Sequence, residues 1–159
     1  MMRALDQSVA TRVSLVAEDA QGVVVGHVRL SRAWLDTRAA LVEVLTLTPL
    51  AVAPELQSTG IGTRLIAAAL ARGDELGFPA VFLEGDWRYY GPRGYAPAQA
   101  LGFQRPSDRI PGPAFQVALL GGRKEGMTGR LVYPEVLWLT DCVGLRDPEL
   151  AGVEDSLGA

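Results

Sequence analysis

The sequence predicts a mixed α/β domain, and three observations carry this prediction. The N-terminal third holds apolar runs typical of two strands joined by a polar turn. A long apolar segment over 41–52 leads through a glycine-containing turn into an amphipathic helical pattern over 61–76. Short apolar segments typical of strands follow this helix. The chain has 159 residues, 48% of them hydrophobic, which is enough for one core, and we expect a single domain over 1–143.

The first predicted element is a hairpin. Its strands cover 13–17 and 23–30, and they flank the polar turn 18–22. Residues 31–40 are predicted to form a polar connection to the next strand.

The segment Leu41–Val52 is rich in Val, Leu and Thr, which predicts a buried central strand. Pro49 lies inside this segment and has no N–H to donate to a neighbouring strand. We therefore expect the pairing to break at Pro49 through a bulge or a splay. Such a break would free backbone groups at Leu50, Ala51 and Val52.

The helix over 61–76 has its apolar residues on one face and ends at Gly77, with Pro79 two residues later. Asp86 is a candidate N-cap for a short helix. The tail 144–159 is rich in Gly, Pro and acidic residues, and we expect it to be poorly ordered. The remaining predicted strands cover 80–83, 101–103, 115–119 and 130–133.

The turn between the central strand and the helix has the composition of an anion site. Backbone N–H groups in the first turn of a helix have no partner within the helix, and they lie at the positive end of its dipole. Gly60 and Gly62 allow unusual backbone conformations and let a ligand approach without a Cβ in the way. Ser58 and Thr59 add hydroxyl donors. A diphosphate fits such a site.

Two other phosphate-binding motifs match this turn poorly. The Walker loop requires a lysine followed by Ser or Thr after its last glycine, whereas Thr63 and Arg64 follow Gly62. The dinucleotide fingerprint requires a third glycine where this chain has Leu65. A nucleotide-binding protein without acyl chemistry remains an alternative, since a glycine turn serves any phosphate.

The remaining pattern, Gln57-x-x-Gly60-x-Gly62 preceded by Pro54, resembles the acyl-CoA pyrophosphate loop of the GNAT N-acetyltransferases. The resemblance implies acetyl-CoA as cosubstrate. It also implies a GNAT-like α/β (α+β) fold with a mixed, mostly antiparallel sheet splayed between its fourth and fifth strands. The implied cofactor-binding residues are Leu50, Ala51, Val52, Gln57, Ser58, Thr59, Gly60, Ile61, Gly62, Thr63 and Tyr90.

A second block, over 84–103, lies one strand after the helix. Its Tyr90, followed four residues later by Gly94 and Tyr95, is similar to the family's Tyr-x-x-x-Gly-Phe, and its doubled tyrosine is similar to the YhbS-like subgroup. Looser similarities lie over 113–117 and 129–134. The similarity covers residues 13 to 134.

The resemblance also exposes a shortened N-terminal region. The family usually places a strand and two helices before the hairpin, where this chain has about a dozen residues. In the family this region forms one wall of the acceptor site. The wall could instead come from a partner subunit, from the C-terminal segment, or from residues before a start codon placed too late. The acceptor is an amine of a small molecule or a peptide.

Acetyl transfer requires a free amine, and deprotonating an alkyl ammonium at pH 7 costs about 4.6 kcal/mol. A pre-aimed backbone N–H near Leu50–Val52 would stabilise the oxyanion. Tyr90 matches the family's tyrosine and is the candidate general acid for the leaving thiolate. Glu43, Glu84 and Asp86 are candidate bases, and a water chain is an equal alternative.

Composition narrows the class of protein. A net charge of −3 lacks the basic field of a nucleic-acid binder, and no apolar run is long enough to cross a membrane. The single Cys142 and the lack of a leader pattern indicate a cytoplasmic protein. No metal site is expected. Trp138 with its apolar neighbours indicates a packing patch or a subunit contact, which leaves a homodimer open. The functional alternative is an acyl-CoA-binding module without turnover.

Overall fold

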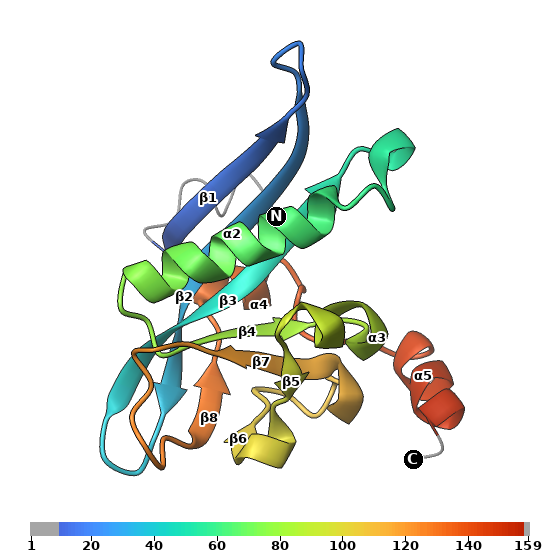
Figure 1. Cartoon of the computed structure of the whole chain (residues 1–159). Helices are drawn as coiled ribbons and strands as arrows, with labels where there is room; N and C mark the ends of the chain where they lie inside the picture. Colours follow the sequence, from blue (N-terminus) through green and yellow to red (C-terminus); the bar gives the residue numbers. More distant parts are fainter. Residues whose placement is uncertain (1–9, 158–159) are drawn as a thin grey trace.

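The computed structural model describes residues 10–157, which form one curved, mostly antiparallel sheet with a long helix across one face (Figure 1). The strand order is β5-β7-β4-β3-β2-β8-β6, and β1 pairs with β2. Two neighbouring pairs, β3/β4 and β6/β8, are parallel. The strands are β1 Thr11–Glu18, β2 Val24–Asp36, β3 Leu41–Val52, β4 Ala80–Glu84, β5 Ala96–Pro97, β6 Phe103–Gln104, β7 Phe115–Leu119 and β8 Gly129–Val132.

The predicted hairpin is present as β1 and β2, but the predicted polar connection over 31–40 is wrong. Strand β2 continues to Asp36, and the connection is reduced to a tight turn in which Thr37 N donates to Ala40 O. The continuing residues alternate between the core and the surface, as in any half-buried strand. Fully buried residues are Ser31, Ala33 and Leu35, and the residues between them are Arg32 and Trp34.

The predicted helix is confirmed as α2 Ile61–Glu75. It packs on one face of the sheet with Leu30, Leu45 and Val81, while Phe82, Phe103 and Phe115 form the core on the other face. Asp86 caps the short helix α3 Trp87–Tyr90 as predicted, since its Oδ1 accepts from Arg88 N at 2.9 Å. The remaining helices are α4 Glu135–Leu139, α5 Glu149–Leu157 and the 3-10 turns η1 Pro54–Leu56, η2 Gly91–Arg93, η3 Gln99–Leu101 and η4 Gly112–Ala114.

The C-terminal segment, for which a poorly ordered tail over 144–159 is predicted, is described by the structure up to residue 157. It contains α5, which lies at the side of the sheet near α3 (Figure 1). None of the residues of α5 is buried, although Leu150 and Val153 are partly covered. The segment before α5 packs against the body through Val143, which is fully buried.

Strand β3 carries the break that Pro49 predicts. Val28 lies opposite Leu50, while Leu30 lies opposite Leu47, so β3 has one extra residue in this interval. A one-residue bulge exchanges the faces of a strand. Leu45 and Leu47 face α2 before the bulge, and Leu50 and Val52 join the same core after it.

The sheet also opens between β3 and β4. These strands pair only at Leu45 with Val81 and at Thr46 with Phe82, after which β3 continues alone beside β2. The predicted splay is thus confirmed, because β3 and β4 correspond in order to the two strands expected to separate. The opening places the end of β3, the start of α2 and the end of β4 around a common gap.

Candidate functional site

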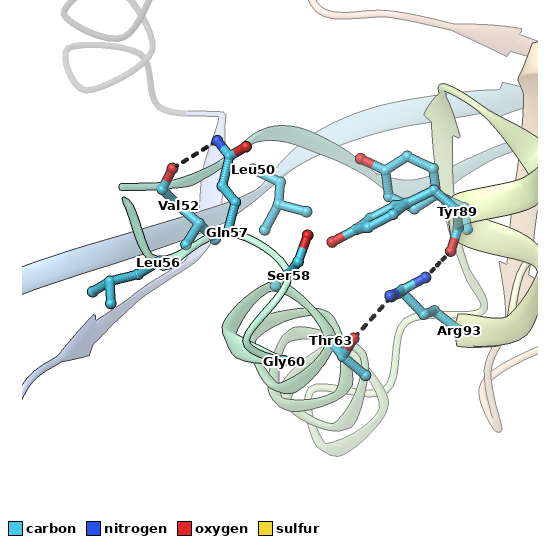
Figure 2. Close-up of a pocket in the computed structure, with 11 residues that line it drawn as sticks. Leu50, Val52, Leu56, Gln57, Ser58, Gly60, Thr63, Tyr89 and Arg93 are labelled. Atoms are coloured by element: carbon cyan, nitrogen blue, oxygen red, sulfur yellow. Dashed lines mark hydrogen bonds between the residues drawn. The ribbon is translucent and has the colours of Figure 1, made fainter. Parts of the chain in front are cut away.

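A cavity of about 700 Å³ lies where the unpaired end of β3 meets the start of α2 (Figure 2). Three segments form its walls: the end of β3, the loop that leads into α2, and the helical turns α3 and η2. Its lining residues are Leu50, Val52, Leu56, Gln57, Ser58, Gly60, Gly62, Thr63, Tyr89, Tyr90 and Arg93.

The end of β3 presents backbone groups to this cavity. Ala53 N donates to Val25 O at 2.8 Å, and the residues of an antiparallel pair alternate in direction. Ala51 therefore directs its N–H and C=O toward β2, whereas Leu50 and Val52 direct theirs to the edge that β4 has left. Of the three residues predicted to have unpaired backbone groups, Ala51 is therefore excluded, and Leu50 and Val52 remain.

Side-chain hydrogen bonds stabilise the conformation of the loop between β3 and α2. Gln57 Nε2 donates to Val52 O at 3.2 Å, and Thr59 Oγ1 donates to Leu56 O at 2.6 Å. Both side chains stabilise the loop, so the hydroxyl of Thr59 is already engaged. Ser58 has a positive φ of 62° and its side chain points into the cavity (Figure 2).

The two glycines of the turn have different physical roles. Gly60 is the N-cap of α2 and has φ 90°, a conformation that glycine adopts without strain. Gly62 is helical, and a Cβ there would collide with the hydroxyl of Tyr89. The first helical bond runs from Arg64 N to Gly60 O, which leaves the N–H groups of 61–63 without helical partners at the positive end of the dipole.

Arg93 and Tyr89 close the cavity opposite the loop (Figure 2). The Arg93 guanidinium lies 3.8 Å from the centroid of the Tyr89 ring and donates to Tyr89 O. Its Nε donates to Thr63 Oγ1 at 3.0 Å, which places a cation at the start of α2. Tyr89, Arg93 and Leu56 line the cavity but are not among the residues predicted from the sequence. Arg93 follows Tyr89 by four residues, and this spacing could have indicated that the two side chains interact.

Tyr90 also lines the cavity, half-buried between two other rings. Its ring makes edge contacts with Tyr89 at 5.0 Å and with Tyr95 at 5.7 Å between centroids. Burial raises the pKa of Tyr90, the phenol of Tyr89 adds to this effect, and Arg93 opposes it. The hydroxyl therefore keeps its proton at neutral pH and can act as a donor.

A second cavity, of about 200 Å³, lies at the same gap. Strand β3 contributes 46–48, β4 contributes Glu84, and the C-terminal part of the chain contributes the rest. Glu84 follows Phe82 on the face of β4 that is turned away from α2. The lining residues are Thr46, Leu47, Thr48, Glu84, Tyr133, Leu137 and Cys142.

Glu84 is the carboxylate that the structure brings to this gap. Gly144 N donates to its Oε2 at 2.9 Å, and Tyr133 is hydrogen-bonded both to Glu84 and to Thr46. Burial raises the pKa of Glu84, and the contacts with Gly144, Tyr133 and Arg109 only partly oppose this effect. A carboxylate with a raised pKa is a stronger base.

The other two candidate bases are engaged elsewhere. Glu43 pairs with Arg12 through Nε and Oε1 at 2.9 Å, at a position opposite Trp34 in β2. Asp86 caps α3 and pairs with Arg88 at 3.1 Å. The structure thus separates Glu43 from Glu84 and Tyr90.

Comparison with known proteins decides the family. Residues 3–95 match the Acetyltransferase (GNAT) family. The chain belongs to the GNAT family. It is 35% identical over 92 residues to the "Uncharacterized N-acetyltransferase YjhQ" of Escherichia coli strain K12, an alignment that covers 58% of this chain. The chain spans half the length of this curated relative.

Two solved GNAT structures share most of this fold. YhbS from Escherichia coli, in complex with CoA, has a TM-score of 0.75 and 27% identity, covering 84% of this chain and 73% of that one. A GNAT family acetyltransferase from Brucella melitensis, in complex with acetyl-CoA, has a TM-score of 0.64 and 29% identity over the same shares. The predicted GNAT-like fold and the resemblance to the YhbS-like subgroup are confirmed.

The first cavity of this GNAT domain brings most of the predicted cofactor-binding residues together. Ala51, Thr59 and Ile61 are not among its lining residues, since Ala51 pairs with β2, Thr59 bonds within the loop and Ile61 packs on the core. Within residues 10–157 no helix is long and apolar enough to span a bilayer. The same described residues contain no group of three potential metal ligands among His, Cys, Asp and Glu.

Proposed function

We propose that this GNAT domain is an N-acetyltransferase that binds acetyl-CoA and transfers its acetyl group directly to an amine. The single observation that carries the proposal is the first cavity, which joins the free edge of β3 to the uncapped start of α2. The CoA and acetyl-CoA complexes of the two structural relatives support the choice of cosubstrate.

In this proposal the diphosphate binds the N–H groups in the first turn of α2. Ser58 donates from the loop, and Arg93 supplies a charge-assisted contact from the opposite wall. The pantetheine arm extends β3 as an added strand by pairing with the outward backbone groups of Leu50 and Val52. An outward N–H group of this stretch that the arm leaves unpaired stabilises the oxyanion of the tetrahedral intermediate. Tyr90 then protonates the leaving thiolate.

Glu84 acts as the general base in this proposal. It lines the second cavity together with Thr46 and Thr48 of β3, and its raised pKa suits proton removal from an ammonium group. Binding of acetyl-CoA without turnover is the alternative outcome of the activity test.

Thermal unfolding tests the cosubstrate. Acetyl-CoA at a hundred times its Kd should raise the free energy of unfolding by about 2.7 kcal/mol, and ATP and NAD at the same concentration should not match it. Gly62→Asp places a Cβ and a like charge beside the diphosphate and should abolish the response. Gly152→Asp is the matched control, because a Cβ at Gly152 has no neighbour within 4 Å. An equal response to all three ligands would overturn the proposal.

Release of free thiol tests the reaction. Acetyl-CoA should lose its acetyl group to at least one compound in a panel of primary amines and amino-terminal peptides. If acetyl-CoA binds tightly but no thiol is released with any acceptor, the domain is a binding module and not an enzyme.

A further inference from the structure

Gln116 of β7 is a buried polar residue that lines neither of the two cavities at the sheet opening. Only 1% of it is exposed, and it lies opposite Leu83 of β4 and Pro97 of β5. Ala118, two residues further along β7, packs in the core beneath α2, so Gln116 faces the same side of the sheet. Burying an amide costs free energy unless it is hydrogen-bonded, so its partner indicates its role.

The partner of Gln116 is the backbone of Gly85, the first residue after β4. Gln116 Nε2 donates to Gly85 O at 2.9 Å, and Gly85 N donates to Ala114 O at 3.0 Å. Both polar groups of the Gly85 backbone are therefore held from the side of β7. The other atom of the amide, Oε1, is buried without a hydrogen-bond partner among the described residues. Within this part of the chain, the bond to Gly85 is thus the one that the Gln116 side chain makes.

Gly85 in turn supports the ring of Tyr90. A Cβ on Gly85 would lie 2.5 Å from Cε2 and 2.9 Å from Cδ2 of Tyr90, so the ring packs directly on the backbone of this glycine. Asp86, the next residue, is the N-cap of α3, and Tyr90 N donates to Asp86 O at 3.0 Å. The position of Gly85 therefore determines both where the helix that carries Tyr90 begins and where its ring lies.

The other contacts of the Tyr90 ring are weaker restraints. Tyr89 and Tyr95 contact it at interplanar angles of 83° and 76°, so both are edge contacts between side chains. Tyr89 is 37% exposed, and the Tyr95 hydroxyl has no hydrogen-bond partner among the described residues. Gly85, in contrast, is backbone that is fixed at both of its polar groups.

We propose that Gln116 is a positioning residue for acetyl transfer, and that through Gly85 it holds the Tyr90 hydroxyl where the leaving thiolate takes its proton. This inference rests on the proposed role of Tyr90 as general acid. In that step the C–S bond breaks and the sulfur takes the phenol proton. The proton released by the new amide nitrogen then restores the phenol through solvent. A displacement of about 1 Å can cost on the order of 10²-fold in rate, so a ring that shifts on Gly85 lowers kcat.

A double-mutant cycle tests this role. Gln116→Met keeps the length of the side chain and removes the donor to Gly85 O, so kcat should fall about tenfold with the Kd of acetyl-CoA and the KM of the amine nearly constant. In the Tyr90→Phe chain, where the proton is already absent, Gln116→Met should cost no further rate. Equal losses in both chains would overturn the inference, since a merely structural role does not depend on the Tyr90 hydroxyl. Gln104→Met is the matched control, because Gln104 is exposed on β6 and should leave kcat unchanged.

Gly85→Ala is a second variant that leaves Gln116 in place, and it decides the question if Gln116→Met does not fold. The added Cβ displaces the Tyr90 ring by direct contact. It should therefore lower kcat in the wild-type chain and cost no further rate in the Tyr90→Phe chain. An unchanged kcat in a folded Gly85→Ala chain would overturn the inference.

NMR spectroscopy without acetyl-CoA separates failure of this inference from failure of the proposed reaction. The Gly85 Hα resonances should carry a ring-current shift that is lost in Tyr90→Leu and kept in Tyr90→Phe. Gln116→Met should reduce this shift, whereas Gln104→Met should not. A folded Gln116→Met chain with the full shift would overturn the positioning role. A reduced shift together with a wild-type kcat in Tyr90→Phe would support the positioning of the ring and overturn only the general-acid role.

Discussion

The two cavities at the sheet opening are built from different kinds of groups. The first offers mainly backbone, namely the outward edge of β3 and the start of α2, and most of its lining comes from the continuous segment 50–63. The second offers side chains, and Thr46, Glu84, Tyr133 and Cys142 come from four separate parts of the chain. Backbone groups can bind the diphosphate, which is the same in every CoA thioester, even when the surrounding side chains are substituted. Side chains, in contrast, can determine which acceptor binds. Substitutions in the second cavity should therefore change turnover and leave cosubstrate binding intact.

The largest expected effect is that of Glu84→Gln. The amide keeps the shape and can accept from Gly144 N–H, but it cannot take a proton. General-base help is worth about 10²–10⁴, so kcat/KM for the amine should fall by that factor with the Kd of acetyl-CoA unchanged. Glu43→Gln is the matched control, because Glu43 is paired with Arg12. A similar loss in both variants would indicate general damage in place of lost catalysis.

The pH profile sharpens this prediction. Because burial raises the pKa of Glu84, the carboxylate form, and with it kcat/KM, should increase with pH through a value above 4.5. The Gln variant should lack this limb and keep only the limb due to the amine itself. A profile that is unchanged in the variant would assign the base role to water.

Tyr90→Phe should have the next largest effect. The ring and its packing stay, but the proton for the departing thiolate is lost, so kcat should fall about a hundredfold, or about tenfold if the thiolate leaves unprotonated. The Kd of acetyl-CoA should stay nearly constant. Tyr95→Phe is the control, because the Tyr95 hydroxyl is buried without a hydrogen-bond partner among the described residues. An unchanged kcat, measured where chemistry limits turnover, would remove Tyr90 from the mechanism.

Arg93→Ala tests the first cavity through its one cationic wall residue among those described. A hydrogen bond to a charged group contributes about 1.5–3 kcal/mol, so the Kd of acetyl-CoA should rise about tenfold or more. The kcat at saturating acetyl-CoA should change little. Arg72→Ala is the matched control, since Arg72 lies in the last turn of α2 and pairs with Glu75. Equal Kd values in the two variants would place the diphosphate away from Arg93.

The sequence predicted the first cavity better than the second for a physical reason. The segment 50–63 is continuous, and Pro49, Gly60 and Gly62 have conformational requirements that can be read directly from the residues. The choice between Glu43 and Glu84 could not be made from sequence. That choice depends on the ion pair between Glu43 and Arg12, which is distant in sequence, and on which two strands separate.

One other error has a local cause. The end of β2 was missed because Arg32 and Trp34 made the segment read as polar, although the residues between them are buried. The composition of the C-terminal segment predicts a poorly ordered tail over 144–159 and gives no sign that Gly144 N donates to Glu84. Tertiary contacts of this kind override composition, which is why the second cavity became visible only in the folded chain.

The smallest expected effect is on stability and again separates the two cavities. The pKa of Glu84 is higher in the folded than in the unfolded chain, so the native state binds the proton more tightly and stability falls as pH rises from the unfolded value through the native one. The groups that face Glu84 are Tyr133, Arg109 and the N–H of Gly144. Glu84→Gln removes the titration, so its Tm relative to the wild type should increase over this interval and then level off. Differential scanning calorimetry across the acidic range measures this difference, and a constant difference at every pH would mean that burial does not perturb Glu84.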